Sequence, residues 1–228
     1  MKCEAHVMTR RAILIVSLTA MLAGCIGAPD EPRGKPSRGT GASLSQSPQT
    51  RACLASLGAS QTRFTPLADQ YYGAGCSTLG SVKLASLRGD DGQLEIANLG
   101  PVSCPVAGAL QGWARYGVDR AARQILGSPL VRIETMGSYS CRNVAGSSRL
   151  SAHATANAVD IAAFRLADGR LISLTTDWNS GSPQIRAFLR TVRDSACKRF
   201  GTVLSPDYNA AHRDHFHLEA GGLKPFCR

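Results

Sequence analysis

Four of the five histidines in the chain fall into two short clusters that also contain carboxylates. The first cluster pairs His153 with Asp160, and the second contains His212, His215 and His217. Two imidazoles and one carboxylate are ligands that suit zinc, and three such ligands leave a fourth position open for water. Side chains two residues apart on a strand point to the same face, so a His-x-His pair can place one ligand beside one catalytic group. The two clusters therefore predict a metal centre with catalytic chemistry.

Further motifs surround these clusters. They are Gly-Ser-Tyr-x-Cys-Arg at 137–142, Ser-x-His-Ala at 151–154, Asn-Ala-x-Asp at 157–160, Ala-Cys-x-x-Phe-Gly-Thr-Val-Leu at 196–204 and Asn-x-x-His-Arg-Asp-His-Phe-His at 209–217. Over roughly residues 51–228 the pattern is similar to the bacterial extensin-like C-terminal domain family. The His and Asp spacing with a later His-x-His also resembles the zinc peptidases that cut peptidoglycan peptides. These are the lysostaphin-type endopeptidases, the D-Ala-D-Ala carboxypeptidases and the penicillin-insensitive murein endopeptidases, with the hedgehog signalling domain as a relative.

The resemblance to the zinc peptidases implies one Zn²⁺ held by His153, Asp160 and His217. Three protein ligands are typical of a catalytic site, because a structural zinc is normally closed by four. The chain departs from the related patterns at two positions. Ala156 stands where the peptidases usually have Gly, and Ala152 stands where family members often have Glu.

The same resemblance implies roles for residues beside the ligands. His215 matches the catalytic histidine of the endopeptidases, and Asp214 matches in place the carboxylate of the carboxypeptidases. We favour His215 as the proton-transfer group, because on a strand Asp214 would face away from it. His212 would orient His215 or contact substrate. Arg142 would bind the developing oxyanion or a terminal carboxylate.

Three more polar residues are candidates for contacts behind the ligands. They are Tyr139, Ser151 and Asn157. Of these, Ser151 would hydrogen-bond to a ligand and fix its orientation. The resemblance thus implies a zinc peptidase that acts on peptidoglycan peptides, as an endopeptidase or a carboxypeptidase. The alternative is a cell-wall-binding module of the same fold that keeps the metal without catalysis. A purely structural wall lipoprotein is disfavoured, because all the ligands and His215 are retained.

The first 25 residues predict export and lipidation. Arg10 and Arg11 precede an apolar run at 12–23 that is short for a membrane span but typical of a signal peptide. The run ends in Leu-Ala-Gly-Cys, which resembles a bacterial lipobox and makes Cys25 the expected lipidation site. An ordinary cleaved signal is the alternative, and Met1 and Met8 both remain possible starts. We expect a periplasmic protein anchored in the membrane by lipid, the outer membrane being favoured over the inner in a Gram-negative cell.

Charge and cysteine content bear on whether the protein binds nucleic acid and on whether its cysteines hold zinc or form disulfides. The net charge is +10, but basic residues are scattered with few aromatic residues between them, which does not favour nucleic-acid binding. Six cysteines follow Cys25 without a Cys-x-x-Cys pair, so an exported chain is expected to form disulfides rather than a zinc-thiolate site. Fifteen pairings remain open among Cys53, Cys76, Cys104, Cys141, Cys197 and Cys227. The oligomeric state remains open.

The remaining pattern predicts a linker followed by one folded domain. Residues 26–50 are rich in Gly, Pro and Ser and read as a flexible linker, and residues 51–228 carry apolar periodicity. Apolar residues at three- and four-residue steps predict helices at 105–126 and 183–200. Short alternating runs between them predict strands joined by hairpins. The expected fold is α+β, an antiparallel sheet with helices on one side, and the resemblance implies a hedgehog or DD-peptidase-like zinc peptidase fold.

Overall fold

The computed structural model describes residues 47–222 and 225–228. Helix α1 (Pro48–Ala59) begins three residues before the predicted start of the domain, because Ser47 Oγ caps it by accepting a hydrogen bond from the Thr50 backbone. The expected signal peptide, Cys25 and the linker as far as residue 46 lie outside the described residues. Within the described ranges, none of the helices combines the length and the hydropathy that a membrane span requires.

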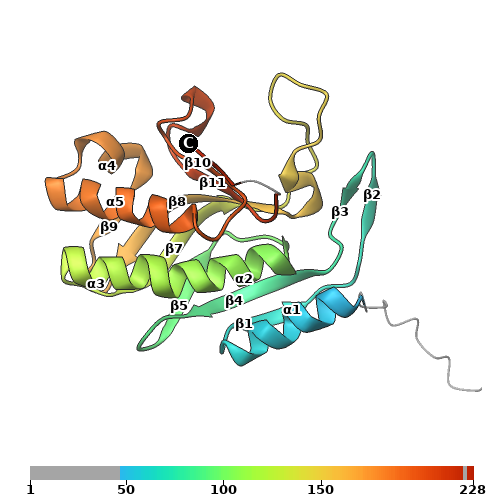
Figure 1. Cartoon of the computed structure of the whole chain (residues 1–228), viewed down its shortest axis with the longest axis horizontal. Helices are drawn as coiled ribbons and strands as arrows, with labels where there is room; N and C mark the ends of the chain where they lie inside the picture. Colours follow the sequence, from blue (N-terminus) through green and yellow to red (C-terminus); the bar gives the residue numbers. More distant parts are fainter. Residues whose placement is uncertain (1–46, 223–224) are drawn as a thin grey trace, which may run out of the picture. The chain divides into compact units, whose positions relative to one another are not determined.

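A ten-stranded mixed sheet forms the body of the domain (Figure 1). Its strand order is β1-β4-β5-β7-β8-β11-β10-β12, with β6 beside β4 and β9 beside β8. The strands are β1 (Arg63–Pro66), β4 (Ser81–Arg88), β5 (Gln93–Ala97), β6 (Val102–Ser103), β7 (Leu130–Gly137), β8 (Ala158–Leu166), β9 (Leu171–Ser173), β10 (Thr202–Leu204), β11 (Phe216–Glu219) and β12 (Phe226–Cys227). A separate hairpin pairs β2 (Tyr71–Gly73) with β3 (Cys76–Ser77).

The expectation of a purely antiparallel sheet is wrong at two places. Strands β5 and β7 pair in parallel, and so do β10 and β12. The first parallel pair arises because a continuous helical segment carries the chain back between the two strands, as a parallel connection requires. This segment consists of α2 (Cys104–Trp113), the π-helix η1 (Ala114–Asp119) and α3 (Arg120–Leu126). It confirms the helix predicted at 105–126.

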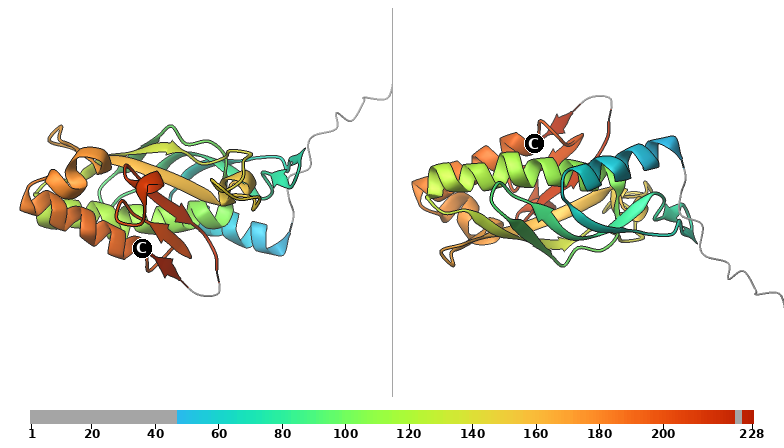
Figure 2. Two further views of the ribbon diagram at one scale, coloured as in Figure 1. Left: turned by 90° about the horizontal axis from the view of Figure 1, so that it is seen from above. Right: turned by 90° about the horizontal axis from the view of Figure 1, so that it is seen from below.

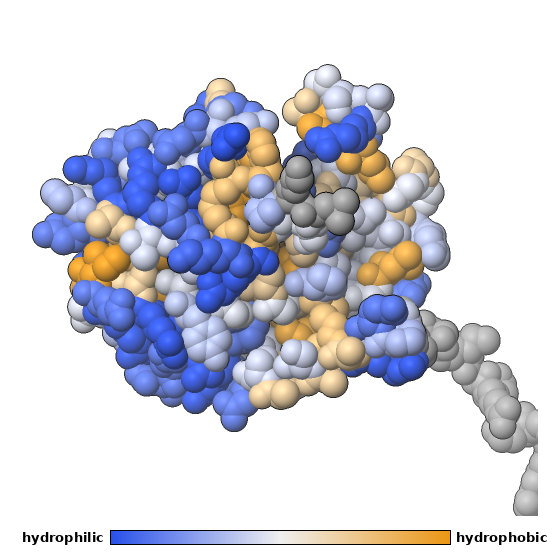
Figure 3. Space-filling view, in the orientation of Figure 1, coloured by the Kyte–Doolittle hydropathy of each residue, from blue (hydrophilic) through white to orange (hydrophobic). Residues whose placement is uncertain are grey.

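The longest helices lie on one face of the sheet, as predicted. Figure 2 shows α1, the α2–α3 segment and α5 (Pro183–Ala196) on the same side of the strands. The outward surface over α3 and α5 is largely hydrophilic (Figure 3). Helix α5 is shorter than the predicted 183–200, and the short helix α4 (Leu174–Ser180) was not predicted from the sequence.

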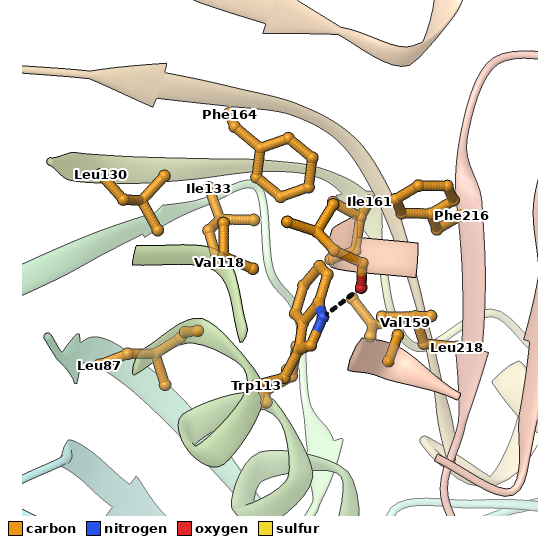
Figure 4. Packing of buried hydrophobic residues seen from close by; sticks show 14 of the residues in the cluster. Leu87, Trp113, Val118, Leu130, Ile133, Val159, Ile161, Phe164, Phe216 and Leu218 are labelled. Atoms are coloured by element: carbon orange, nitrogen blue, oxygen red, sulfur yellow. Dashed lines mark hydrogen bonds between the residues drawn. The ribbon is translucent and has the colours of Figure 1, made fainter. Parts of the chain in front are cut away.

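The core lies between these helices and the sheet (Figure 4). Trp113 is fully buried against Phe164, and its indole Nε1 donates a 2.9 Å hydrogen bond to the Val192 carbonyl oxygen of α5. The η1 segment packs closely against α5 at Gly117, where an added Cβ would lie 2.3 Å from Ser195 Oγ and 2.9 Å from Trp113 Cδ1. A side chain at this position would require Ser195 and Trp113 to shift.

All six candidate cysteines form disulfides, as predicted. The pairs are Cys53–Cys104, Cys76–Cys141 and Cys197–Cys227. They join α1 to α2, the β2–β3 hairpin to the loop after β7, and the end of α5 to β12. Each closes a loop of 30 to 65 residues, for which the reduced entropy of the unfolded chain contributes roughly 3–5 kcal/mol. The second pair bears on function, because Cys141 immediately precedes Arg142.

Candidate metal centre

Strand register brings two of the predicted ligands together. Strands β8 and β11 pair antiparallel, with His217 directly opposite Asp160. Directly opposed residues project their side chains to the same face of a sheet. His217 Nδ1 consequently lies 2.9 Å from Asp160 Oδ1.

The third predicted ligand comes from a short 3₁₀ helix, η2 (Ala152–Thr155), that leads into β8. Ser151 Oγ caps this helix by accepting a hydrogen bond from the His153 backbone, and Ala156 ends it with a left-handed backbone (φ +54°). The tight turn directs His153 Nε2 to 3.2 Å from Asp160 Oδ2 and 3.1 Å from His217 Nδ1. Ala156 thus adopts a conformation that glycine adopts more readily, which explains why glycine suits this position.

The three side chains fit a metal ion. A tetrahedral ion bound at about 2.0–2.1 Å requires ligand atoms about 3.3 Å apart. The two imidazole nitrogens are 3.1 Å apart, and each lies 2.9–3.2 Å from a different oxygen of the Asp160 carboxylate. His153 and His217 are only 2% and 8% exposed. Two nearly buried imidazoles around one carboxylate form a compact donor set, so His153, Asp160 and His217 can hold a metal ion.

Hydrogen bonds on the outer side fix the orientation of both imidazoles. The His153 ring places Nδ1 against the Ser138 carbonyl oxygen at the end of β7. The His217 ring places Nε2 at 2.8 Å from Glu219 Oε1. His153 therefore presents Nε2 to the centre and His217 presents Nδ1, the arrangement by which second-layer acceptors orient metal-binding histidines. Glu219 was not predicted, although its place two residues after His217 puts both on one face of β11.

The electrostatics of this group favour a cation. Burial alone would raise the pKa of Asp160, but hydrogen bonds from His153 and His217 hold it well below its usual range. Burial alone would lower the pKa of His217, but hydrogen bonds to Asp160 and Glu219 raise it to about 9. The His217 hydrogen bond in turn lowers the pKa of Glu219. Two carboxylates therefore stabilise positive charge at this point, which in the metal-free protein is a proton on His217.

His215 lies beside the ligand group, and Asp214 contacts it. His215 Nδ1 is 2.8 Å from Asp214 Oδ1, and His215 Nε2 is 3.6 Å from Asp160 Oδ1. The expectation that Asp214 faces away from His215 is wrong. The strand begins only at Phe216, so the alternation of strand side chains does not apply to the two residues before it.

His212 borders the same group from the 3₁₀ helix η3 (Ala210–His212). Its ring centre is 5.2 Å from that of His215 and 5.8 Å from that of His217, and its Nδ1 is 2.7 Å from Asn209 Oδ1. Burial and the neighbouring histidines lower the pKa of His212 to about 4. At neutral pH it is therefore an uncharged imidazole beside the centre.

Arg142 lies on the loop after β7 with an exposed side chain. Its positive charge contributes to the lowered pKa of His212. The backbone of the same residue accepts a 3.1 Å hydrogen bond from the Ser151 amide, which ties the loop to the start of η2.

The three supporting candidates have different roles. Ser151 caps the helix of His153 through the backbone and does not contact the imidazole. Asn157 braces the fold by donating to the Ala220 carbonyl oxygen at 2.7 Å and accepting from Ser103 Oγ at 3.0 Å. The Tyr139 ring lies against Tyr72, with centroids 5.2 Å apart, rather than on a ligand.

Comparison with known proteins gives one result. The model of the family described as "Extensin-like protein C-terminus" matches residues 51–228, which include every candidate residue of the centre. Neither a curated protein nor a solved structure matches the chain. Because the matched segment covers most of the chain, the protein belongs to the extensin-like protein C-terminus family.

Proposed function

We propose that this protein is a zinc-dependent peptidase that acts on the peptides of peptidoglycan. The observation that carries the proposal is the group of His153, Asp160 and His217, with His215 beside it and hydrogen-bonded to Asp214. The donor set supports zinc because imidazole and carboxylate suit this ion and three ligands leave a position for water or substrate. We also propose that the protein is related to the zinc peptidases and shares their fold.

A zinc ion in such a site supplies polarisation of a carbonyl group and a water of lowered pKa. His215 is placed to move the proton. Its Nδ1 hydrogen bonds to Asp214, which leaves Nε2 directed to the ligand group as the basic nitrogen. We therefore propose that His215 transfers the proton and that Asp214 orients its ring. It favours the endopeptidase-like division of roles that the sequence predicted.

Arg142 and His212 complete the proposed site. The exposed guanidinium of Arg142 suits a developing oxyanion or a peptide carboxylate. His212 remains neutral at physiological pH because its pKa is about 4, so it offers a hydrogen bond without adding charge. The expected lipid anchor at Cys25 and a position in the periplasm, at the outer membrane, would bring this site to its substrate in the wall.

The test is digestion of purified peptidoglycan by the zinc-loaded protein, with the products identified by mass spectrometry. We expect peptide-bond cleavage by the wild type and none by the metal-free protein or by His215→Ala. Glu95→Gln, a change at an exposed strand position, should cleave like the wild type. Tight binding to peptidoglycan without cleavage, at full zinc occupancy, would favour the wall-binding module instead. Full cleavage by the metal-free protein would exclude a metal mechanism.

A further inference from the structure

The β2–β3 hairpin carries aromatic side chains that the core does not use. Tyr71 is 78% exposed and Tyr72 is 52% exposed, and the Tyr72 ring lies 5.2 Å from that of Tyr139, centre to centre. We call these three residues the tyrosine patch. A buried tyrosine ring contributes substantially to stability, whereas exposed aromatic rings in a cluster typically mark a binding surface.

The tyrosine patch is built on a rigid support. The Cys76–Cys141 disulfide fastens β3 to the loop after β7. Beyond the strands, the Thr78 amide donates a 2.9 Å hydrogen bond to the Gln70 carbonyl oxygen. The turn between β2 and β3 uses left-handed backbone at Gly73, Ala74 and Gly75, and the two glycines adopt it more readily than the alanine. Rings held in this way lose little entropy when a ligand binds.

The tyrosine patch is also connected to the metal centre. Tyr139 lies between Ser138, whose carbonyl oxygen contacts the His153 imidazole, and Ser140, whose amide donates a 3.1 Å hydrogen bond to the His153 carbonyl oxygen. Strand β3 packs against η2, the 3₁₀ helix that carries His153. Figure 1 shows the hairpin at the same end of the sheet as η2 and the loop after β7. A chain bound across the tyrosine patch would therefore extend toward the metal ligands.

The surrounding chemistry identifies the class of ligand. Residues 70–82 contain no charged side chain, although the chain as a whole has a net charge of +10. Nucleic acids and anionic lipid surfaces are bound through clusters of Lys and Arg. Residues 70–82 contain none, and the nearest in sequence to Tyr139 is the single Arg142. The hairpin offers aromatic rings together with hydroxyl and amide groups. Sugar rings match this combination, because their C–H faces are apolar and their edges carry hydroxyls.

We propose that the tyrosine patch is a binding site for the sugar rings of a neutral glycan chain, adjacent to the metal centre. The proposal rests on the proposed function where it names the source of the sugar, since the peptides of peptidoglycan are attached to a glycan strand. Sugar bound at Tyr71 and Tyr72 would hold the attached peptide near His153 and its neighbours. The patch would then select wall fragments that still carry sugar over free peptides.

The binding experiment uses the purified protein and a soluble oligomer of β-1,4-linked N-acetylglucosamine, titrated by calorimetry. The wild type should bind, and the double variant Tyr71→Ala/Tyr72→Ala should bind at least about tenfold more weakly. Tyr71→Phe should retain binding, because it keeps the ring. Tyr116→Ala is the matched control, since Tyr116 is 48% exposed and lies on η1 between Arg115 and Arg120. Thermal melting of each variant checks that the fold is intact.

A second measurement separates this proposal from the peptidase proposal. Cleavage of a sugar-bearing wall fragment by the double variant should show a raised KM with little change in kcat, whereas cleavage of the free peptide should be unchanged. Failure of the wild type to bind the oligomer would overturn the glycan site even if the protein cuts peptides. Equal losses on both substrates would make the tyrosine patch a peptide site and would also overturn it. Binding of the oligomer by a protein that cuts no peptide would leave the glycan site standing and refute the peptidase.

Discussion

The metal ligands and the proposed catalytic residues are positioned by different parts of the molecule. Asp160 and His217 lie on neighbouring strands in direct register. Arg142, His212 and His215 lie on loops or short turns, held by a disulfide, a capping asparagine and an adjacent carboxylate. Two of the three predicted ligands are thus part of the sheet, and His153 lies on the 3₁₀ helix η2 that leads into β8, whereas the groups beside them depend on local contacts. Changes to the ligands should therefore abolish the centre, and changes to the loops should alter its chemistry.

Core packing explains why the strand-borne ligands are placed so firmly. Val159 and Ile161 flank Asp160 on β8, and Phe216 and Leu218 flank His217 on β11; all four apolar side chains are fully buried. Sliding either strand by one residue would move these side chains out of the core. The energetics of the core therefore maintain the register that opposes Asp160 and His217.

The largest expected effect is loss of the metal. His217→Ala or His153→Ala should remove zinc binding, because two remaining donors cannot hold the ion as three do. His212→Ala should retain the metal, since the His212 ring packs edge-to-face against His217 and is not one of the three predicted donors. Metal content per chain, measured by mass spectrometry after gel filtration, checks the prediction. Full occupancy in either ligand variant would contradict the assignment.

The next effect concerns the loop residue closest to the ligands. His215→Ala should keep the metal and the fold but lower the hydrolysis rate by about 10²–10⁴-fold, the usual contribution of a general acid–base group. The measurement is single-bond cleavage at matched metal occupancy, with Glu95→Gln as control. Loss of the metal in His215→Ala would instead place His215 among the ligands and erase the distinction between sheet and loop.

The same distinction decides what the sequence could predict. A His and Asp group that could hold a metal ion and a helix in each of the stretches 105–126 and 183–200 followed from spacing and periodicity, although α5 ends at Ala196. The orientation of Asp214 was predicted wrongly, since β11 begins only at Phe216 and the strand alternation does not extend to Asp214 and His215. The disulfide pairing and the parallel β5–β7 contact depend on residues far apart in the chain. No local sequence pattern predicts either of them.

The pKa of His217 predicts how the affinity of the centre for a metal ion depends on pH. The pKa of His217 is about 9 in the metal-free protein, so binding at lower pH must displace a proton from it. The affinity should rise by about tenfold per pH unit from pH 6.5 and level off near pH 9. The stability of the metal-free protein depends on pH with the opposite sign. There, the stability contributed by this proton is full below the ordinary value of 6.5 and is lost as the pH rises through about 9. Titration of a competing chelator at several pH values measures the affinity, and a flat profile would contradict the prediction.

The smallest expected effect lies behind the ligands, at Glu219. Its carboxylate accepts a hydrogen bond from His217 Nε2, which leaves Nδ1 free to bind the ion. Glu219→Ala should weaken metal binding by about 10–100-fold, the usual effect of removing an acceptor behind a ligating histidine. Glu219→Gln should lose less, because the amide oxygen still accepts the hydrogen bond without the charge.

Glu95→Gln is the matched control for Glu219, since it changes an exposed carboxylate on β5, a strand that carries none of the predicted ligands. Nitrogen-15 NMR of the histidine rings supplies a readout independent of activity, because it reports which His217 nitrogen carries the proton. In the metal-bound wild type that proton should be on Nε2, and in Glu219→Ala this preference should weaken. If Glu219→Ala binds the metal as tightly as the wild type, the register of β8 and β11 alone orients His217. The sheet would then determine the ligand geometry without help from the second layer.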